Sequence, residues 1–390
     1  MKTPVMDRWI RKTVEHRLPW SVHLDLTYRC NERCIHCYLD HRDHGEMTSE
    51  EVKKVLDQLA EAGTLFLTFS GGEIFLRPDL FELIGYAREL HFDVSIKTNA
   101  LLIDADRARR LNELKVRKIQ VSIYSAQPEI HDAITKVRGS LERTLTAIRF
   151  LQAQGLNVKI ACPLMKQNLT AYRGVQALAE ELGVPYVLDL TITPKMDGDA
   201  SILSLRLTTQ EILPVLRDPG LQPPSCVSTS GQEIAPAVGS ASSSGIESQA
   251  YDDIPCSAGH NSCYISPYGD VLPCVQMPIA AGNLRHQRFD EIWFDSKPME
   301  RVRAVRESQL PVCSSCSIRK YCERCPGLAQ MEGGDLLAAY ERACDMAELN
   351  ARLAGIENPT SAWHARKAEK SAAPQLRILP TWEPVATSAR

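Results

Sequence analysis

The sequence predicts an α/β fold, with a partial (β/α)6 TIM-like barrel in the first part of the chain and a smaller cysteine-rich domain after it. Three observations lead to this prediction. Between residue 21 and about residue 193, short β-rich segments alternate with amphipathic helical segments, as in repeated βα units. Residues 221–253 are rich in Ser, Gly and Ala and lack an apolar period. Eight of the thirteen cysteines follow that stretch.

Six segments have the β-branched and aromatic content of strands. They are residues 22–27, 64–69, 92–97, 117–124, 157–162 and 186–191. Helix-start signals separate them: Thr48 with Glu51 three residues later, Asp79 after a proline, and Asp104 before ADRARRLNEL. Six βα units fit an incomplete barrel better than a closed eight-fold one.

The chain of 390 residues is long enough for two cores. We expect a helical lead-in at 1–20, the barrel at 21–220, a flexible linker or loop at 221–253, the cysteine-rich domain at 254–350 and a weakly ordered tail at 351–390. A net charge of −3 gives no reason to expect a nucleic-acid partner. Without a signal peptide or a long apolar run, no membrane association and a cytoplasmic location are expected.

The first cysteine group, Cys30, Cys34 and Cys37, follows the first strand directly and so lies on the functional rim of the barrel. In a reducing compartment, clustered cysteines more often bind metal than form disulfides. CX3CX2C supplies three thiolates where a closed zinc or [4Fe–4S] site needs four, which leaves one iron of a cluster open. The alternative is a zinc site completed by His36. Gly71-Gly72-Glu73 after the second strand favours the cluster, because two glycines permit close backbone approach and a carboxylate can accept from an ammonium group.

These motifs, with Lys97-Thr98-Asn99 and VSIYS at the ends of the third and fourth strands, resemble the radical S-adenosylmethionine (SAM) superfamily over residues 21–193. The resemblance implies a SAM-cleaving [4Fe–4S] cluster on the three cysteines and a 5′-deoxyadenosyl radical as the reactive species. It also implies SAM contacts from the side chains or backbone of His36, Gly71, Gly72, Glu73, Asn99 and Ser122. Relatives often have arginine where Thr135 stands, so Lys97 and Arg138 are the local candidates to neutralise the SAM carboxylate.

The second cysteine group comprises Cys256, Cys263, Cys274, Cys313, Cys316, Cys322, Cys325 and Cys344. Eight thiolates make two four-cysteine sites, and the spacing alone suits zinc as well as iron–sulfur clusters. The stretch CSAGHNSCYISPYGDVLPC and the later CSSC and CERC resemble the SPASM domain of radical SAM maturases. This resemblance implies two auxiliary [4Fe–4S] clusters, one on Cys256, Cys263, Cys274 and Cys325 and one on Cys313, Cys316, Cys322 and Cys344. The final gap is one residue shorter than usual, which leaves the assignment of Cys322 and Cys325 open.

The combined resemblance implies an enzyme, a radical SAM oxidoreductase that cross-links a ribosomally made peptide. Alternatives are a sulfatase-type protein residue, a tetrapyrrole as in heme d1 biosynthesis, and a non-catalytic electron carrier. Only about twenty residues precede the first strand, so we expect a separate small leader-binding protein, and a flavodoxin- or ferredoxin-type electron donor. Catalytic residues are not identified; Lys97, Tyr124 and Asp189 are candidates only through their positions at strand ends, and Cys162 and Cys226 are interpreted as bystanders.

Overall fold

In the part of the chain that the structure describes, ten strands form a single sheet in the order β10-β9-β8-β1-β2-β3-β4-β5-β6-β7. The structure is a computed structural model, and it describes residues 4–221, 227–228 and 253–372. The strands are β1 (Ser21–Thr27), β2 (Phe66–Gly71), β3 (Asp93–Thr98), β4 (Lys118–Ser122), β5 (Val158–Pro163), β6 (Tyr186–Asp189), β7 (Val227–Ser228), β8 (Ser262–Ile265), β9 (Asp270–Leu272) and β10 (Gly282–Asn283). The six predicted strands are therefore present as β1 to β6, and each pairs with the next in parallel.

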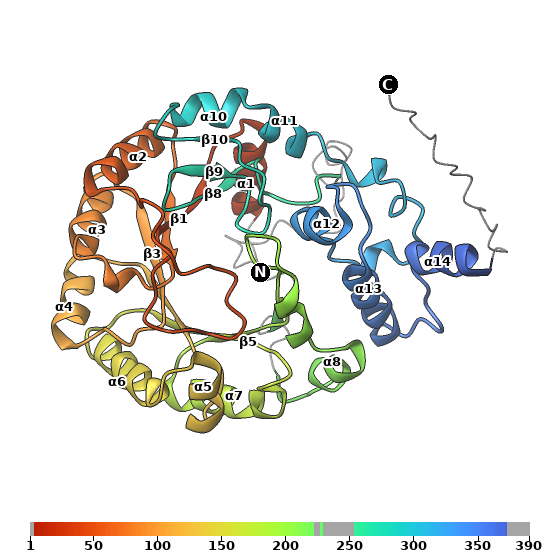
Figure 1. Ribbon diagram of the computed structural model, residues 1–390, viewed down its shortest axis with the longest axis horizontal. Helices are drawn as coiled ribbons and strands as arrows, with labels where there is room; N and C mark the ends of the chain where they lie inside the picture. Colours follow the sequence, from red (N-terminus) through yellow and green to blue (C-terminus); the bar gives the residue numbers. More distant parts are fainter. Residues whose placement is uncertain (1–3, 222–226, 229–252, 373–390) are drawn as a thin grey trace, which may run out of the picture.

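Helices cover the outside of the curved sheet and leave its inner face toward the centre of a ring (Figure 1). The α-helices are α1 (Pro4–Glu15), α2 (Ser49–Glu61), α3 (Leu80–Glu89), α4 (Ala105–Glu113), α5 (Pro128–Thr135), α6 (Ser140–Ala153), α7 (Tyr172–Leu182), α8 (Thr209–Leu216), α10 (Phe289–Asp295), α11 (Lys297–Arg303), α12 (Pro326–Gly333), α13 (Glu341–Leu353) and α14 (Ala362–Ala372). Short 3-10 helices are η1 (Ile74–Leu76), η2 (Leu169–Ala171), η3 (Ser201–Leu205), η5 (Glu307–Gln309) and η6 (Arg319–Tyr321).

Alternation along β1 to β5 divides the sheet into an apolar outer face and a polar inner face. The outward residues are buried in one hydrophobic core with the covering helices, and they include Leu24, Phe69, Ile96, Ile119 and Ile160. Because successive strand residues point to opposite faces, the residues between them face the interior. Most of those interior residues are polar, in contrast to the aliphatic layers that fill a closed TIM barrel.

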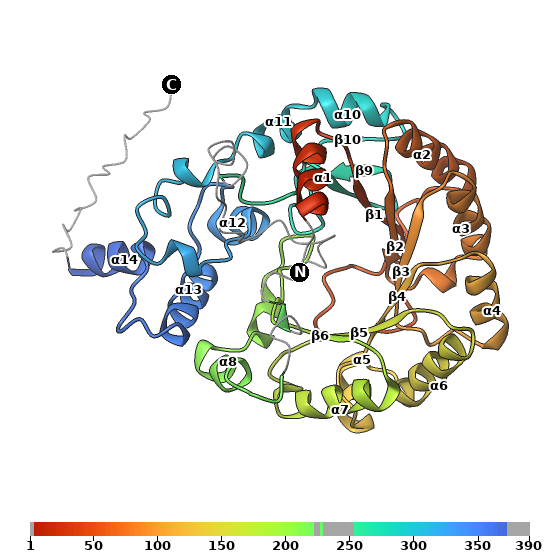
Figure 2. The ribbon, with the colours of Figure 1, turned by 180° about the vertical axis from the view of Figure 1, so that it is seen from behind.

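The cysteine-rich part of the chain is not separated from the barrel, because its strands extend the same sheet. β8 pairs in parallel with β1, with Val22 opposite Cys263, and β9 and β10 follow as antiparallel neighbours. Figure 2 shows these strands continuing the barrel wall beyond β1. No strand was predicted for these residues, so this connection was not expected from the sequence.

The ends of the expected domains differ in how far the structure describes them. The expected linker at 221–253 lies mostly outside the described residues, although Val227 and Ser228 form β7 beside β6. Within the expected weakly ordered tail at 351–390, the structure forms α14 at residues 362–372. Polar contacts fix α14: the Nδ1 of His364 lies 2.6 Å from a carboxylate oxygen of Glu348. A helix that is held by polar contacts does not need the repeat of apolar residues by which a helix is predicted from sequence.

In the described residues, no helix is both long and apolar enough to cross a bilayer.

Candidate functional site

The first cysteine group lies in the loop after β1, at the rim where the carboxyl ends of the parallel strands meet. Four backbone hydrogen bonds fix this loop from two sides. The N–H groups of Gly72 and Glu73 donate to the carbonyls of Thr27 and Arg29, at 2.8 and 2.9 Å, and so extend the β1–β2 ladder into the loop. From α5, the carbonyls of residues 134 and 135 accept the N–H groups of residues 35 and 33.

Gly71 and Gly72 are required by the close approach of the two strands. A Cβ on Gly72 would lie 2.3 Å from the carbonyl oxygen of Arg29, and a Cβ on Gly71 would lie 2.1 Å from that of Thr27. Gly71 also has a φ of +136°, which side chains rarely adopt. Both glycines therefore permit the contact that positions the cysteine loop.

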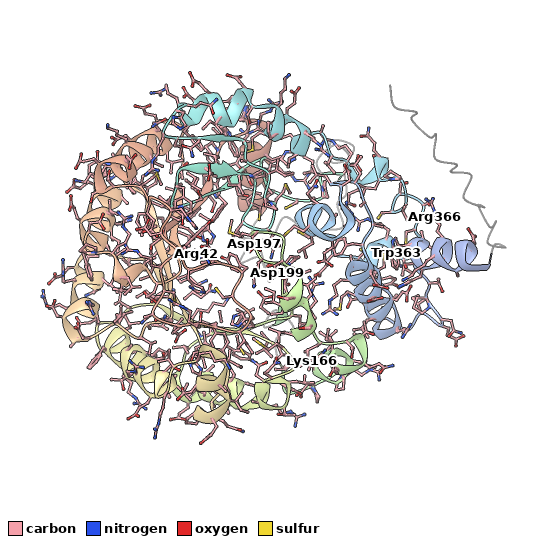
Figure 3. All side chains as sticks on the ribbon, viewed as in Figure 1. Arg42, Lys166, Asp197, Asp199, Trp363 and Arg366 are labelled. Carbon is pink, nitrogen blue, oxygen red and sulfur yellow. The ribbon has the colours of Figure 1, made fainter. Side chains whose placement is uncertain are left out.

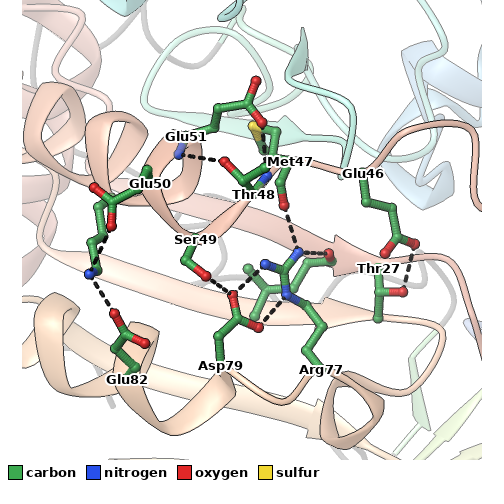
Figure 4. Close-up of polar contacts among 12 residues, drawn as sticks. Thr27, Glu46, Met47, Thr48, Ser49, Glu50, Glu51, Arg77, Asp79 and Glu82 are labelled. Carbon is green, nitrogen blue, oxygen red and sulfur yellow. Dashed lines mark hydrogen bonds and ion pairs between the residues drawn. The ribbon is translucent and has the colours of Figure 1, made fainter.

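Arg77 holds both ends of the segment that contains the three cysteines (Figure 4). Its Nη1 donates to the carbonyl of Leu26 before the loop and to that of Met47 after it, at 3.0 and 2.9 Å. Its other nitrogens form a bidentate pair with Asp79, which also accepts from Ser49. Asp79 was predicted as a helix cap, but it makes no side-chain capping bond, because its carboxylate is engaged by Arg77.

The three thiols of the loop are partly buried and protonated in the absence of metal. Burial raises the pKa of Cys30 to about 12 and also raises the pKa values of Cys34 and Cys37. The Sγ of Cys34 lies 3.6 Å from the hydroxyl of Tyr124, and the Nδ2 of Asn99 lies 3.8 Å from the Sγ of Cys30. Metal binding would therefore release protons from these thiols.

Two register rows of inward-facing residues cross the barrel interior. We name the first the lumen row: Asp25, Ser70, Lys97, Gln120 and Lys159. Register pairs join Asp25 to Ser70, Lys97 to Gln120, and Gln120 to Lys159. The second row comprises Tyr264, His23, Thr68, Ser95 and Lys118.

Asp25 is fully buried at the centre of a hydrogen-bonded group that links β1 to β8. It accepts from the hydroxyl of Tyr264 at 2.7 Å and lies 3.0 Å from the Nε2 of His23. Tyr264 is in turn 2.7 Å from the hydroxyl of Tyr28. Side-chain contacts of Asp25 thus join β1 to β8 in addition to the pairing of the two strands.

Charged side chains of both signs lie around the centre of the ring in Figure 3, where Arg42, Asp197 and Asp199 are labelled. All three are exposed. Met196 donates its N–H to the carbonyl of Tyr38 at 3.1 Å, which connects the segment after β6 to the cysteine loop. The same view places Trp363 and Arg366 on α14, away from the ring.

Three cysteines of the second group, Cys256, Cys274 and Cys325, lie near one another beside β8 and β9. Cys263 is on β8, and Cys274 follows β9. Burial, together with the nearby thiols of Cys256 and Cys274, raises the pKa of Cys325 to about 12. Cys325 therefore belongs spatially with this first set.

The other four cysteines form a second set beside α13. Burial raises the pKa of Cys322 to about 11, with further contributions from Cys313 and Cys316. The same three cysteines raise the pKa of Cys344, after burial, to about 12. The N–H of Ala362 at the start of α14 donates to the Sγ of Cys316 at 3.4 Å. Spatial grouping thus separates Cys322 from Cys325, which the spacing could not do.

Comparison with known proteins gives the family of the chain. The profile of the Radical SAM superfamily matches residues 24–192, and that of the SPASM iron–sulfur cluster-binding domain matches residues 256–317. An AdoMet-dependent heme synthase of Methanosarcina barkeri is 30% identical over 332 residues, which cover 82% of this chain and 94% of that protein. The chain belongs to the radical SAM superfamily. It carries a SPASM domain and is an enzyme whose family implies SAM and iron–sulfur clusters as cofactors.

Other radical SAM proteins match a similar share of the chain. The mycofactocin maturase MftC of Mycobacterium ulcerans is 29% identical over 320 residues, which cover 79% of this chain and 83% of that protein. The crystal structure of Streptococcus suis SuiB bound to S-adenosylmethionine has a TM-score of 0.65 at 18% identity, and covers 88% of this chain and 81% of that one. The likeness to SuiB supports the predicted fold.

The residues that are expected to contact SAM differ in how deeply they are buried around the cysteine loop. Asn99 is beside Cys30, and its Nδ2 donates to Asn31 at 2.7 Å. Ser122 ends β4 and is half-buried. The Nδ1 of half-buried His36 has no hydrogen-bond partner among the described residues, and burial lowers the pKa of His36 to about 4. An unsatisfied imidazole nitrogen beside three thiols fits a site that receives a polar cofactor.

Glu73 differs from the others because its carboxylate is fully buried and already engaged. It accepts from the N–H of Phe75 at 3.0 Å, from the hydroxyl of Thr98 at 2.8 Å and from the N–H of Asn99 at 2.9 Å. In this structure Glu73 fixes the end of β3 beside the cysteine loop. Of the candidates for the SAM carboxylate, Lys97 is in the lumen row, whereas Arg138 is exposed.

Proposed function

We propose that this enzyme cleaves SAM at a [4Fe–4S] cluster on Cys30, Cys34 and Cys37 and oxidatively cross-links a ribosomally made peptide. The observation that carries the proposal is that Cys325 lies near Cys256 and Cys274, whereas Cys322 and Cys344 lie near Cys313 and Cys316. An oxidative cross-link removes two hydrogen atoms from the substrate. One leaves as an atom and the other as a proton and an electron, so the reaction needs an electron acceptor.

SAM supplies the hydrogen-abstracting 5′-deoxyadenosyl radical when it is bound at the reduced cluster. The residues that would hold SAM are those around the cysteine loop: His36, Gly71, Gly72, Glu73, Asn99 and Ser122. Glu73 acts through the strand end that it fixes, and Asn99 is close enough to Cys30 to contact a ligand of the open iron. Two auxiliary clusters would bring the total to three and provide the acceptor, since cluster potentials span a wide range.

The peptide substrate is supported by the match to the mycofactocin maturase over 83% of its length. A separate small leader-binding protein and a flavodoxin- or ferredoxin-type electron donor are part of this proposal. The second candidate substrate is a tetrapyrrole, supported by the match to the heme synthase over 94% of its length.

The first test removes the proposed SAM cluster. Anaerobically reconstituted wild-type protein should contain about twelve irons per chain, and the combined alanine variant of Cys30, Cys34 and Cys37 should keep about eight. The variant should make no 5′-deoxyadenosine. A Cys162→Ala variant is the matched control, because Cys162 is packed in the barrel core rather than at the rim. If the triple variant still cleaves SAM, the cluster has been assigned to the wrong cysteines.

The second test separates the two substrates and the role of the auxiliary sets. The wild-type enzyme is incubated with SAM, a reductant and either short peptides encoded beside its gene or a carboxylate-bearing iron tetrapyrrole. We expect a peptide that has lost two hydrogen atoms by mass spectrometry; loss of carbon dioxide from the tetrapyrrole would favour the second candidate. Cys344→Ala should still yield 5′-deoxyadenosine but little product. Full product from a variant shown to lack the second auxiliary cluster would exclude an electron-accepting role for it.

A further inference from the structure

Two arginines of the cysteine-rich part are almost completely buried and lack an anionic partner. Arg324 lies between Cys322 and Cys325 and is 5% exposed, and Arg303 ends α11 and is 6% exposed. Neither forms an ion pair with any carboxylate in the described residues, although the Glu307 carboxyl group, which pairs with Arg319, also interacts electrostatically with Arg324. Arginine remains charged in proteins, and burial of a charge without a direct partner is costly. Further negative charge near each guanidinium would therefore stabilise the fold.

Arg324 faces the second cysteine set. Its Nε and Nη2 donate to the carbonyl of Ala338 at 3.0 and 2.8 Å, and Nη2 also donates to that of Leu336. Its Nη1 has no partner in the described chain. Burial lowers the pKa of Arg324, and Cys313 and Cys322 are close enough to counteract that decrease. The guanidinium is thus buried near two proposed ligands of one cluster, and one of its nitrogens is unsatisfied.

Arg303 has a similar relation to Cys263, a proposed ligand of the other auxiliary cluster. Its Nε donates to the carbonyl of Gly259 at 2.5 Å, and its guanidinium lies 4.6 Å from the ring centre of Trp293. Both Nη1 and Nη2 lack partners among the described residues. Burial lowers the pKa of Arg303 to about 10, and the thiol of Cys263 is the group that opposes this effect.

The SAM-site cysteines have two buried carboxyl groups beside them, whereas the arginine of the same loop, Arg33, is exposed. Buried Glu32 accepts from the Sγ of Cys34 at 3.3 Å, and buried Glu73 lies on the other side of the same loop. Both carboxyl groups raise the pKa of Cys30, after burial. A cluster with four thiolate ligands is anionic and becomes more so on reduction, so a nearby buried cation favours the reduced form and a carboxylate opposes it.

We infer that Arg303 and Arg324 are counter-cations, one for each auxiliary cluster, and that they raise the reduction potentials of these clusters above that of the SAM cluster. The inference rests on the proposed clusters, but it goes beyond the proposed reaction because it concerns the order of potentials. An electron released by the substrate would then move to an auxiliary cluster and not return to the SAM site. The two arginines act on the clusters and not on the substrate, so they are tuning residues.

The test measures potentials in the full-length reconstituted enzyme without substrate. Redox titrations followed by electron paramagnetic resonance are made on wild-type protein, Arg324→Met, Arg324→Lys and Arg303→Met. Each methionine variant should lower the reduction potential of one auxiliary cluster by at least 59 mV, which corresponds to a tenfold change in the one-electron redox equilibrium. Arg324→Lys should lower the potential less, because it keeps the positive charge. Arg301→Met is the matched control, because Arg301 is on the same helix as Arg303 but pairs with Asp335 at the surface.

Unchanged potentials in both methionine variants, with all three clusters present, would overturn the inference, as would an equal shift in Arg301→Met. If Arg324→Met cannot hold its cluster, the lysine variant decides: a retained cluster supports the need for positive charge, and a lost cluster contradicts it. Because no substrate is involved, failure of this test leaves the cross-linking proposal intact. Failure of the cross-linking assay likewise leaves the measured order of potentials intact.

Discussion

Replacing Gly72 with alanine should displace the cysteine loop without touching any cysteine. The added Cβ would be 2.3 Å from the carbonyl oxygen of Arg29 and 2.7 Å from that of Tyr28. An ordinary contact begins near 3.4 Å, so the loop must move by about 1 Å, the difference between 3.4 and 2.3 Å. That movement would stretch the bonds from Gly72 to Thr27 and from Glu73 to Arg29, now 2.8 and 2.9 Å, beyond hydrogen-bonding distance.

The expected destabilisation is about 3 kcal/mol, since two lost hydrogen bonds cost about 1 kcal/mol each and overpacking adds about 1 kcal/mol or more. Anaerobic urea unfolding measures the stability, and iron content and 5′-deoxyadenosine formation report on the SAM site. Gly85→Ala is the matched control, because its Cβ would meet only Leu114 at 3.7 Å within helix α3. Wild-type stability and wild-type SAM cleavage in Gly72→Ala would refute the claim that this contact positions the loop.

Two further predictions concern buried charge. His131 is buried, accepts the N–H of Tyr124 and has its pKa lowered by burial to about 4. The unfolded chain binds a proton at this histidine below about pH 6.5, so His131 alone should lower the free energy of unfolding by about 2 kcal/mol from pH 7 to pH 5. His131→Asn should flatten that slope in urea unfolding; an unchanged slope would contradict the assignment. Arg206 and Glu332 form a bidentate pair at 2.9 and 2.7 Å, with side chains 13% and 14% exposed. Arg206→Met should cost about 3 kcal/mol, and a double variant with Glu332→Met should cost less than the sum of the single changes; strict additivity would show that the pair is not coupled.

The barrel and the first cysteine site could be predicted because their signals are local. Each of β1 to β6 has a run of apolar or β-branched residues, and the cap signal at Thr48 produced the expected capping box with Glu51. The three cysteines followed a strand end, which fixed their position at the rim. These features depend on neighbours in sequence, and a single chain shows them directly.

The rest depended on contacts between distant residues. Nothing near Arg77 indicated that it would bind carbonyls on both sides of the cysteine loop, and its proline-aspartate context suggested only a helix start. Arg303 and Arg324 look like surface arginines in sequence, and only their burial reveals them. The role of Glu73 in fixing β3 also required the position of Thr98. A long polar side chain gives no local sign of being buried, because its partners come from other elements.

The pairing of β1 with β8 has a consequence for how the chain is made. Val22 is opposite Cys263, so the first strand to leave the ribosome must wait for a partner about 240 residues later in synthesis. Until then, one edge of β1 is an open template for pairing with another chain. Inserting iron into the N-terminal site before this edge closes would expose a half-built sheet together with a reactive cofactor. A truncated barrel that ends before β8 would carry the same open edge permanently, so aggregation rather than an isolated SAM-cleaving module is the expected product.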